Sequence, residues 1–315
     1  MGLSVIWAAP EAPFMQTIWD ENEDLHRARA RNIADALRED LGTGDWTAML
    51  VPQRLVRAQL VVREDAVLCG QEWFAGCIRA LDPQAHLTWA AQDGARMRAD
   101  QVVCTISAQS RALLTAERAA LNFLQTLSAT ATQTARYVSA IAGASPNPRG
   151  CLILDTRKTL PGLRQAQKYA VRMGGGANQR MALWDGILIK ENHIAAAGGI
   201  SQALQAARAL LSSHASDGTI SLQIEVETIA QLHEALREGA QSLLLDNFSL
   251  EGLRDAVAQT WSFAQAEGRT PALLEASGGL SLDQLRAVAQ TGVDRISIGR
   301  LTKDITATDY SLRVV

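Results

Sequence analysis

The second half of the chain repeats one unit: a short apolar run, an amphipathic segment with helical spacing, and another apolar run. Strands that are apolar on both faces and alternate with helices are typical of a parallel sheet. Six such runs, with one more segment near residues 140–150, predict a closed or nearly closed α/β barrel, and an open doubly wound sheet is the alternative. The runs are CLILD (151–155), GILIK (186–190), SLQIEVE (221–227), SLLLD (242–246), ALLEAS (272–277) and RISIG (295–299).

The first half of the chain lacks this repeat and predicts a small α+β domain. Helical spacing covers residues 30–40 and 71–82, and strand-like segments cover residues 57–65, 86–94 and 96–107. A long helical stretch over residues 110–143 would connect this domain to the second half, and its middle, SATATQTA, consists of small residues. We therefore expect another element to pack closely there. No GxGxxG motif follows a predicted strand, which argues against a dinucleotide-binding fold.

Each predicted strand of the second half ends in charged residues or in glycine. The carboxyl ends of barrel strands meet at one face, and this face carries the chemistry of α/β barrels. We therefore expect a single polar site at these ends. The residues concerned are Asp155-Thr156-Arg157-Lys158, Lys190, Glu225 and Glu227, Asp246, Ser277-Gly278-Gly279, and Gly299.

The residue types at these ends favour anionic ligands. Cationic side chains can hold carboxylates or phosphates, while Glu225 and Asp246 can hold ribose hydroxyls, a metal ion or a developing positive charge. Glycines near Ser277 and Gly299 would let backbone N–H groups approach phosphate oxygens. Residues 111–190 carry eleven Lys and Arg against three acids in a chain of net charge −3. This local excess predicts a pocket for a small anion, although a basic solvated face would give the same count.

Several of these residues also have an ordinary structural interpretation. Arg157 and Lys158 could form a surface ion pair with Asp155, worth about 0–1 kcal/mol. Lys190 could be a solvated cap. His193 has no second His or Cys at ligand spacing, so it does not predict a zinc site. Ser277 lacks a GxSxG motif and therefore does not predict a serine nucleophile.

The bulk properties of the chain argue against several classes of partner. A net charge of −3 gives no indication of nucleic acid binding. Four scattered cysteines without a CxxC pair predict reduced thiols in a reducing compartment. The apolar start, MGLSVIWAAPEAPFM, lacks a basic leader and is too short to span a bilayer, so we expect a loosely ordered N-terminal extension. These features predict a cytoplasmic protein with no membrane partner.

Nine motifs of the chain, in family order, resemble those of the quinolinate phosphoribosyltransferases. They extend from about residue 38 to residue 303: REDLGTGDWTA, ERAALNFLQTLSATAT, LDTRKTLPGLR, KYAVRMGGGANQR, LIKENHI, IEVET, LLLDNF, EASGGLS and SIGRLT. The resemblance implies an N-terminal α/β sandwich domain over residues 1–120, to which a tail over 305–315 returns. It implies a six- to seven-stranded incomplete α/β barrel over residues 121–304.

The resemblance also implies a reaction and a homodimer with shared sites. Phosphoribosyl would pass from phosphoribosyl pyrophosphate to quinolinate with decarboxylation, giving nicotinate mononucleotide, pyrophosphate and CO₂ for NAD biosynthesis, with Mg²⁺ as cofactor. Quinolinate would be held by Arg157, Gln179, Arg180 and Lys190, and by Arg118 of a partner subunit. The cosubstrate would be held by Lys158, Glu225, Asp246, Ser277, Gly278, Gly279, Gly299 and Lys303. Glu225 and Asp246 would bind the metal, and the catalytic residues would be Lys158, Lys190, Glu225 and Asp246.

One position departs from the family pattern GGGxNHR. In this chain Gln179 stands where the histidine is expected, between Asn178 and Arg180. A hydrogen bond to a charged group contributes about 1.5–3 kcal/mol, against about 1 kcal/mol for a neutral one. We therefore predict that substrate binding survives and that any pH dependence arising from the histidine is lost.

Three other functions stay open at this point. The chain could be a related transferase that uses another anionic heteroaromatic acid. It could be a barrel lyase in which Lys158 or Lys190 forms a Schiff base, which borohydride would trap. It could also be a non-catalytic phosphate-binding regulator, although the number of polar strand ends argues against this.

Overall fold

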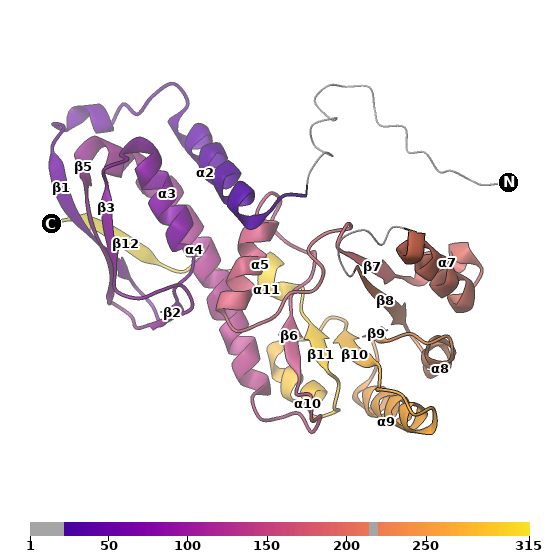
Figure 1. The fold of residues 1–315 in the computed structure, drawn as a ribbon. Helices are drawn as coiled ribbons and strands as arrows, with labels where there is room; N and C mark the ends of the chain where they lie inside the picture. The colour runs from indigo at the N-terminus through magenta and orange to yellow at the C-terminus, as the bar shows by residue number, and fades with distance from the viewer. Residues whose placement is uncertain (1–21, 214–219) are drawn as a thin grey trace.

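The computed structural model describes residues 22–213 and 220–315, in which a sheet domain and a parallel-stranded domain are joined by one long helix (Figure 1). The expected N-terminal extension falls mostly on residues 1–21, which lie outside the described residues. Among the residues that are described, no helix is both long and apolar enough to cross a membrane.

The N-terminal domain is built on an antiparallel sheet with the strand order β12-β1-β5-β3. In β1 the residues at alternate positions, Ala58, Leu60 and Val62, are buried, as a strand with one face on a core requires. Phe74 of α3 packs edge-on against Trp89 of β3 in this core. The elements are α2 (Leu25–Leu41), η1 (Ala48–Leu50), β1 (Leu55–Val62), β2 (Ala66–Val67), α3 (Gln71–Leu81), β3 (His86–Trp89), β4 (Arg96–Met97), β5 (Val102–Gln109) and β12 (Tyr310–Val314).

The last strand of the chain belongs to this first domain. β12 pairs with β1 over the register Ala58–Val314 to Val62–Tyr310. The Tyr310 hydroxyl lies 2.9 Å from the buried Ser128 hydroxyl of the long helix. The last strand therefore completes the sheet of the N-terminal domain, on the far side of the molecule from the parallel strands (Figure 1).

The long helix α4 (Ser110–Ile141) runs from the sheet domain into the parallel-stranded domain and continues without a break through residue 120. Its small residues allow the close packing that the sequence predicted. A Cβ atom added to Gly174, which follows α5 (Arg164–Met173), would lie 2.6 Å from Cβ of Thr134. The 1–120 and 121–304 domain boundaries stay a prediction.

The second domain contains a six-stranded parallel sheet in the order β6-β11-β10-β9-β8-β7. Apart from β6, the strands follow one another in chain order, and β6 pairs with the last strand, β11, as it would in a barrel. Among the described strands that a closed barrel would pair, only β6 and β7 are not paired with each other. The topology is therefore that of an incomplete barrel rather than a doubly wound sheet. Residues 142–151 are all described and contain no strand, so the seventh strand considered from the sequence does not form. The strands are β6 (Leu152–Leu154), β7 (Gly186–Ile189), β8 (Ser221–Val226), β9 (Ser242–Asp246), β10 (Leu273–Ser277) and β11 (Arg295–Ser297).

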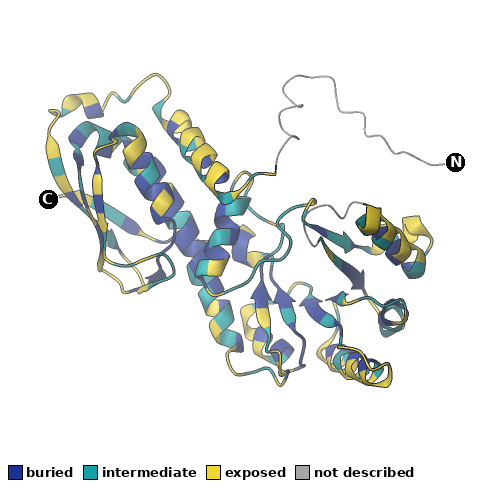
Figure 2. Cartoon of the chain, in the orientation of Figure 1, coloured by how far each residue is buried: buried dark blue, intermediate teal, exposed yellow. Residues whose placement is uncertain are grey.

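Alternate residues of these strands point to opposite faces of the sheet. One set, including Ile224, Leu245 and Leu274, packs in the apolar core beneath the surrounding helices, and most residues of these strands are buried (Figure 2). The other set, including Glu225 and Asp246, therefore faces the barrel interior. The remaining elements are α6 (Glu191–Ala197), α7 (Ile200–Ser213), α8 (Ile229–Arg237), α9 (Leu250–Ala266), η2 (Leu282–Gln284), α10 (Leu285–Ala289) and α11 (Arg300–Lys303).

Candidate active site

A cavity of about 580 Å³ opens at the carboxyl ends of the parallel strands, and we call it the upper cavity. Twelve of the thirteen residues predicted for the site line it: Arg157, Lys158, Gln179, Arg180, Lys190, Glu225, Asp246, Ser277, Gly278, Gly279, Gly299 and Lys303. Thr156, Asn247, Glu275, Ser297 and Arg300 also line it and were not predicted as binding residues. Glu227, the other acid at the end of β8, is exposed and does not line this cavity.

Arg157 lies in the upper cavity without the carboxylate partner that the sequence suggested. Asp155 is fully buried and pairs with Lys168 Nζ and Asn178 Nδ2 instead. Burial raises the pKa of Asp155, and the attraction of Lys168 opposes the rise. The interpretation of Arg157 and Asp155 as a surface ion pair is therefore wrong. Nε of Arg157 is buried and has no hydrogen-bond partner among the described residues.

Lys168, which the sequence did not single out, fixes the segment that carries Gln179 and Arg180. Its side chain is fully buried on α5, and Nζ donates to the backbone oxygen of Gln179 at 2.8 Å. Asp155 accepts from the backbone N–H of Gln179 at 3.0 Å. Burial lowers the pKa of Lys168, and Asp155 opposes this change. Lys168 lies in a helical sequence with many polar residues, RQAQKYAVRM, and nothing in that sequence indicates that its side chain is buried.

Arg180 brings another guanidinium group to the upper cavity. Its Nη1 donates to the backbone oxygen of Gly186 at 2.7 Å, which anchors the side chain at the start of β7. Burial lowers the pKa of Arg180, and the positive charge of nearby Arg157 lowers it further. Two guanidinium groups close enough to repel each other favour binding of an anion between them.

Two carboxylates also line the upper cavity. Lys190 Nζ donates to Glu225 Oε2 at 2.8 Å, and Glu225 is buried while Lys190 is partly exposed. Burial raises the pKa of Glu225, Lys190 opposes the rise, and the negative charge of Asp246 adds to it. Glu225 and Asp246 are therefore neighbours at the ends of β8 and β9. His193 accepts from the Lys190 backbone N–H and thus acts as part of a helix cap.

Two carboxylates at this edge suit a magnesium ion that is shared with a substrate. Magnesium usually binds through one or two carboxylates together with substrate phosphates and water. Across the described ranges 22–213 and 220–315, no group of three or more His, Cys, Asp or Glu residues could form an all-protein metal site. The Glu225–Asp246 pair fits the shared type of site.

Neighbouring side chains lie so close to Gly278 and Gly299 that neither position has room for a larger residue. Gly278 has φ 128°, and a Cβ atom there would lie 2.6 Å from Oδ1 of Asn247. A Cβ atom on Gly299 would lie 3.0 Å from Cδ of Lys158. The Lys158 backbone oxygen accepts from Thr302 Oγ1 at 2.7 Å, which holds Lys158 beside Gly299. A side chain at either glycine would narrow the space for a phosphate group.

Arg118 is the one predicted site residue that one chain does not bring to the upper cavity. It is exposed on α4 and lines a separate cavity of about 340 Å³ against α2 and residues 161–163. Near the start of α4, Thr115 donates to Asp45, so residues 45–51 lie alongside this helix. In this segment Trp46, Met49 and Leu50 are 82%, 65% and 83% exposed.

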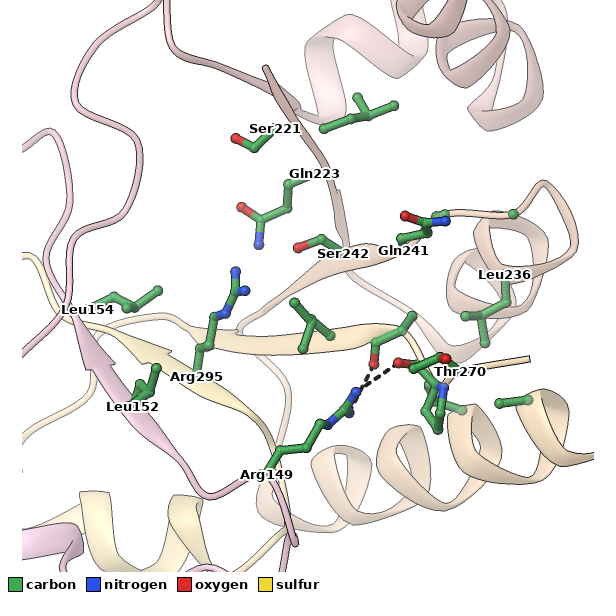
Figure 3. Close-up of a pocket in the computed structure, with 18 of the residues that line it drawn as sticks. Arg149, Leu152, Leu154, Ser221, Gln223, Leu236, Gln241, Ser242, Thr270 and Arg295 are labelled. Carbon is green, nitrogen blue, oxygen red and sulfur yellow. Dashed lines mark hydrogen bonds between the residues drawn. The ribbon is translucent and has the colours of Figure 1, made fainter. Parts of the chain in front are cut away.

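A larger cavity of about 1010 Å³, the lower cavity, opens at the amino ends of the same strands (Figure 3). Its most prominent cation, Arg149, is already bound: the guanidinium donates to the backbone oxygens of Pro271 and Ala272, at 2.9 and 3.4 Å (Figure 3). Arg149 also pairs with Asp294 at 2.8 Å and stacks over Trp261. Gln179 and Arg180 line both cavities.

Comparison with known proteins agrees with this geometry. Two family models match the chain: "Quinolinate phosphoribosyl transferase, N-terminal domain" over residues 45–128 and the C-terminal domain of the same family over residues 130–313. The chain is 39% identical over 289 residues to the nicotinate-nucleotide pyrophosphorylase [carboxylating] of Mycobacterium leprae, covering 89% of this chain and 95% of that one. It is 37% identical over 279 residues to the probable enzyme of that name from Bacillus subtilis, covering 88% and 90%.

A solved structure gives the same result. The nicotinate-nucleotide pyrophosphorylase from Francisella tularensis superimposes with a TM-score of 0.83 at 39% identity, covering 94% of this chain and all of that one. The predicted fold class, an α/β N-terminal domain followed by an incomplete parallel barrel, is confirmed. The chain belongs to the quinolinate phosphoribosyl transferase family.

Proposed function

We propose that this protein transfers phosphoribosyl from phosphoribosyl pyrophosphate to quinolinate, with loss of CO₂, to form nicotinate mononucleotide and pyrophosphate. One observation carries the proposal: a single cavity is lined by guanidinium groups, which we call the cationic wall, and by a pair of carboxylates, which we call the carboxylate wall. Quinolinate has two carboxylates and the cosubstrate has three phosphate groups, so both reactants match this division of charge. The reaction belongs to NAD biosynthesis.

The cationic wall would bind quinolinate. The guanidinium of Arg157, whose Nε has no partner, and that of Arg180 can each take a carboxylate through parallel hydrogen bonds. These contacts orient the pyridine nitrogen and replace the water that would otherwise solvate the two carboxylates. Lys158, with its compact ammonium group at the mouth of the cavity, would hold phosphate oxygens beside Gly299.

The carboxylate wall would stabilise the charge that develops on the sugar. Breaking the bond from the anomeric carbon to pyrophosphate gives that carbon oxocarbenium character, which nearby carboxylates favour. The pyridine nitrogen then attacks the anomeric carbon, and its positive charge supports departure of CO₂ by stabilising the electron pair left on the ring. Lys190, already paired with Glu225, can exchange that contact for a quinolinate carboxylate.

Glu225 and Asp246 would hold Mg²⁺ together with the cosubstrate. When bound, the ion would neutralise charge on the pyrophosphate oxygens. Two neighbouring carboxylates, Glu225 and Asp246, suit an ion that also binds the oxygens of a substrate.

A homodimer would complete the site. Arg118 is exposed and distant from the upper cavity of its own chain, so it can contribute only to the cavity of another subunit. Exposed Trp46, Met49 and Leu50 lie on the segment beside the start of α4, and a cluster of this kind is typical of a protein interface. All four cysteines are free thiols, which supports a location in the reducing cytoplasm.

The Schiff-base alternative has less support. An ammonium group engaged with a carboxylate, as Lys190 is with Glu225, has no lone pair with which to attack a carbonyl. Lack of borohydride trapping in the presence of a carbonyl substrate would exclude that mechanism.

The deciding experiment is incubation of the purified protein with quinolinate, phosphoribosyl pyrophosphate and Mg²⁺. We expect nicotinate mononucleotide by chromatography and an equal amount of CO₂ from carboxyl-labelled quinolinate. A parallel reaction with nicotinate in place of quinolinate is the control. Faster turnover of nicotinate or of another heteroaromatic acid would contradict the proposed substrate, and no product with any acid would contradict the reaction.

A further inference from the structure

Three side chains form a hydrogen-bonded chain across the barrel interior between the upper and lower cavities. Gln179 Nε2 donates to Gln223 Oε1 at 2.8 Å, and Gln223 Nε2 donates to Glu275 Oε2 at 3.0 Å. Gln223 and Glu275 are buried, with 6% and 1% of their surface exposed. Gln179 lines both cavities, Glu275 lines the upper one, and Gln223 lines the lower one, where Figure 3 shows it near Arg295.

The direction of this chain follows from donor and acceptor counts. Gln223 turns its NH₂ group to Glu275 Oε2 at 3.0 Å, the arrangement that suits a carboxylate oxygen acting as acceptor. The carbonyl oxygen of Gln223 then faces Gln179, which must answer with its own NH₂ group. Burial raises the pKa of Glu275, and the hydrogen bond from Gln223 and the positive charge of Arg295 on β11 oppose the rise.

The backbone of Gln179 is fixed independently of this chain. Asp155 accepts from its N–H at 3.0 Å, and Lys168 donates to its carbonyl oxygen at 2.8 Å. Only the amide at the end of its side chain could turn over, and the Gln223 contact determines which way it faces. A Gln179 amide held in this way keeps one N–H free of Gln223. If it turned over, it would present an oxygen where an N–H now lies.

We propose that Gln223 and Glu275 are positioning residues of the quinolinate subsite, which orient the Gln179 amide so that its free N–H faces a substrate carboxylate. This rests on the proposed function, because it assumes that quinolinate lies against Gln179 and Arg180. Neither Gln223 nor Glu275 touches the substrate. Their effect on the reaction passes through Gln179, whose uncharged amide depends on its orientation to attract rather than repel an anion.

Gln223→Met tests the proposal most directly, since methionine has a similar length but neither donates nor accepts in this way. We expect the KM for quinolinate to rise about tenfold, the effect of losing one hydrogen bond to a charged acceptor. The KM for phosphoribosyl pyrophosphate and kcat should stay within about twofold of the wild type. Ser221→Ala, on the same face of β8 but outside the hydrogen-bonded chain, is the matched control and should change none of these values.

Exchanging the glutamine at position 223 with the glutamate at position 275 should restore quinolinate binding, a result that a purely structural role of these residues would not give. Gln223→Glu alone places two carboxyl groups side by side, and Glu275→Gln alone removes the acceptor that sets the direction. Glu275→Gln should therefore raise the quinolinate KM by about tenfold, whereas Gln223→Glu keeps an acceptor beside Gln179 and should raise it less. In the double variant the new carboxylate at position 223 accepts from both neighbours, so Gln179 again donates to it. The double variant should return the quinolinate KM to within about threefold of the wild type.

The outcomes separate this inference from the proposed function. If the wild type forms nicotinate mononucleotide but the quinolinate KM is unchanged in Gln223→Met, the positioning role is wrong and the function stands. The role is equally wrong if the double variant is no better than Glu275→Gln alone. If Gln223→Met does not fold, the double variant and its two parents decide the question. A wild type that forms no product removes the function and this inference together.

Discussion

The two cavities of the barrel differ in a way that volume alone does not reveal. The lower cavity is the larger, about 1010 Å³ against about 580 Å³ for the upper one. Yet Arg149 in the lower cavity already has backbone oxygens, Asp294 and Trp261 as partners. Arg157 in the upper cavity has a buried Nε with no partner in the described part of the chain. The unsatisfied Arg157, rather than the amount of space, is what distinguishes the end of the barrel that we propose binds anions.

Replacing one arginine in each cavity should give opposite results, and this is the largest effect we expect. Arg157→Ala should weaken quinolinate binding by about 2–5 kcal/mol, or roughly 30- to 4,000-fold in kcat/KM, with little change in stability. Arg149→Ala should lower the free energy of unfolding by about 1–3 kcal/mol, because buried Asp294 loses its ion-pair partner and keeps only its hydrogen bonds from Asn147 and Leu274. The KM for quinolinate should stay unchanged. Steady-state kinetics and urea unfolding measure both. Near-normal kinetics for Arg157→Ala would end the contrast between the two cavities.

Mixing two inactive variants would sharpen the comparison by asking whether the upper cavity is complete in one chain. Arg118→Ala and Lys190→Ala should each lose most activity alone. After denaturation and joint refolding, about a quarter of the wild-type activity should return, since half of the randomly paired dimers are mixed and one of the two sites in each is intact. Activity of the mixture is compared with that of each variant refolded alone. No gain on mixing would argue against a shared site.

A smaller effect on quinolinate binding is expected at Gln179, which lines both cavities and stands where the family pattern has a histidine. In the Gln179→His variant the quinolinate KM should fall several-fold as the pH drops below about 6.5, because the protonated imidazole attracts a carboxylate. For the wild type the same pH range should produce no change from this position. The KM is measured between pH 5.5 and 8 for both proteins, with the KM for phosphoribosyl pyrophosphate as the internal control. Identical profiles would show that this position does not contact the substrate.

Much of the upper cavity could be predicted because strand ends are a local property of the sequence. Each apolar run ends within two residues of a residue that lines the upper cavity, and the parallel topology brings these ends together. Glu225 and Asp246 are found in this way without any knowledge of distant contacts. The inward direction of both follows from the two-residue period of a strand.

Residues that depend on contacts between distant segments could not be found in this way. Lys168 lies in a polar helical sequence, and only the packing of α5 on α4 places its charge in the core beside Asp155. Gln223 has the expected inward position, but its link to Glu275 joins two strands 52 residues apart in the chain. The segment at 142–151, which the sequence left open as a seventh strand, instead connects α4 to β6 without pairing among the described strands.

The position of β12 has a consequence for how the protein is made. The strand that completes the first sheet consists of residues 310–314, so a nascent chain emerging from the ribosome exposes the outer edge of β1 until the barrel has been synthesised. An uncovered edge of this kind can pair with other chains. Emergence of residues 310–314, rather than emergence of the first domain, is thus the moment at which that edge becomes protected.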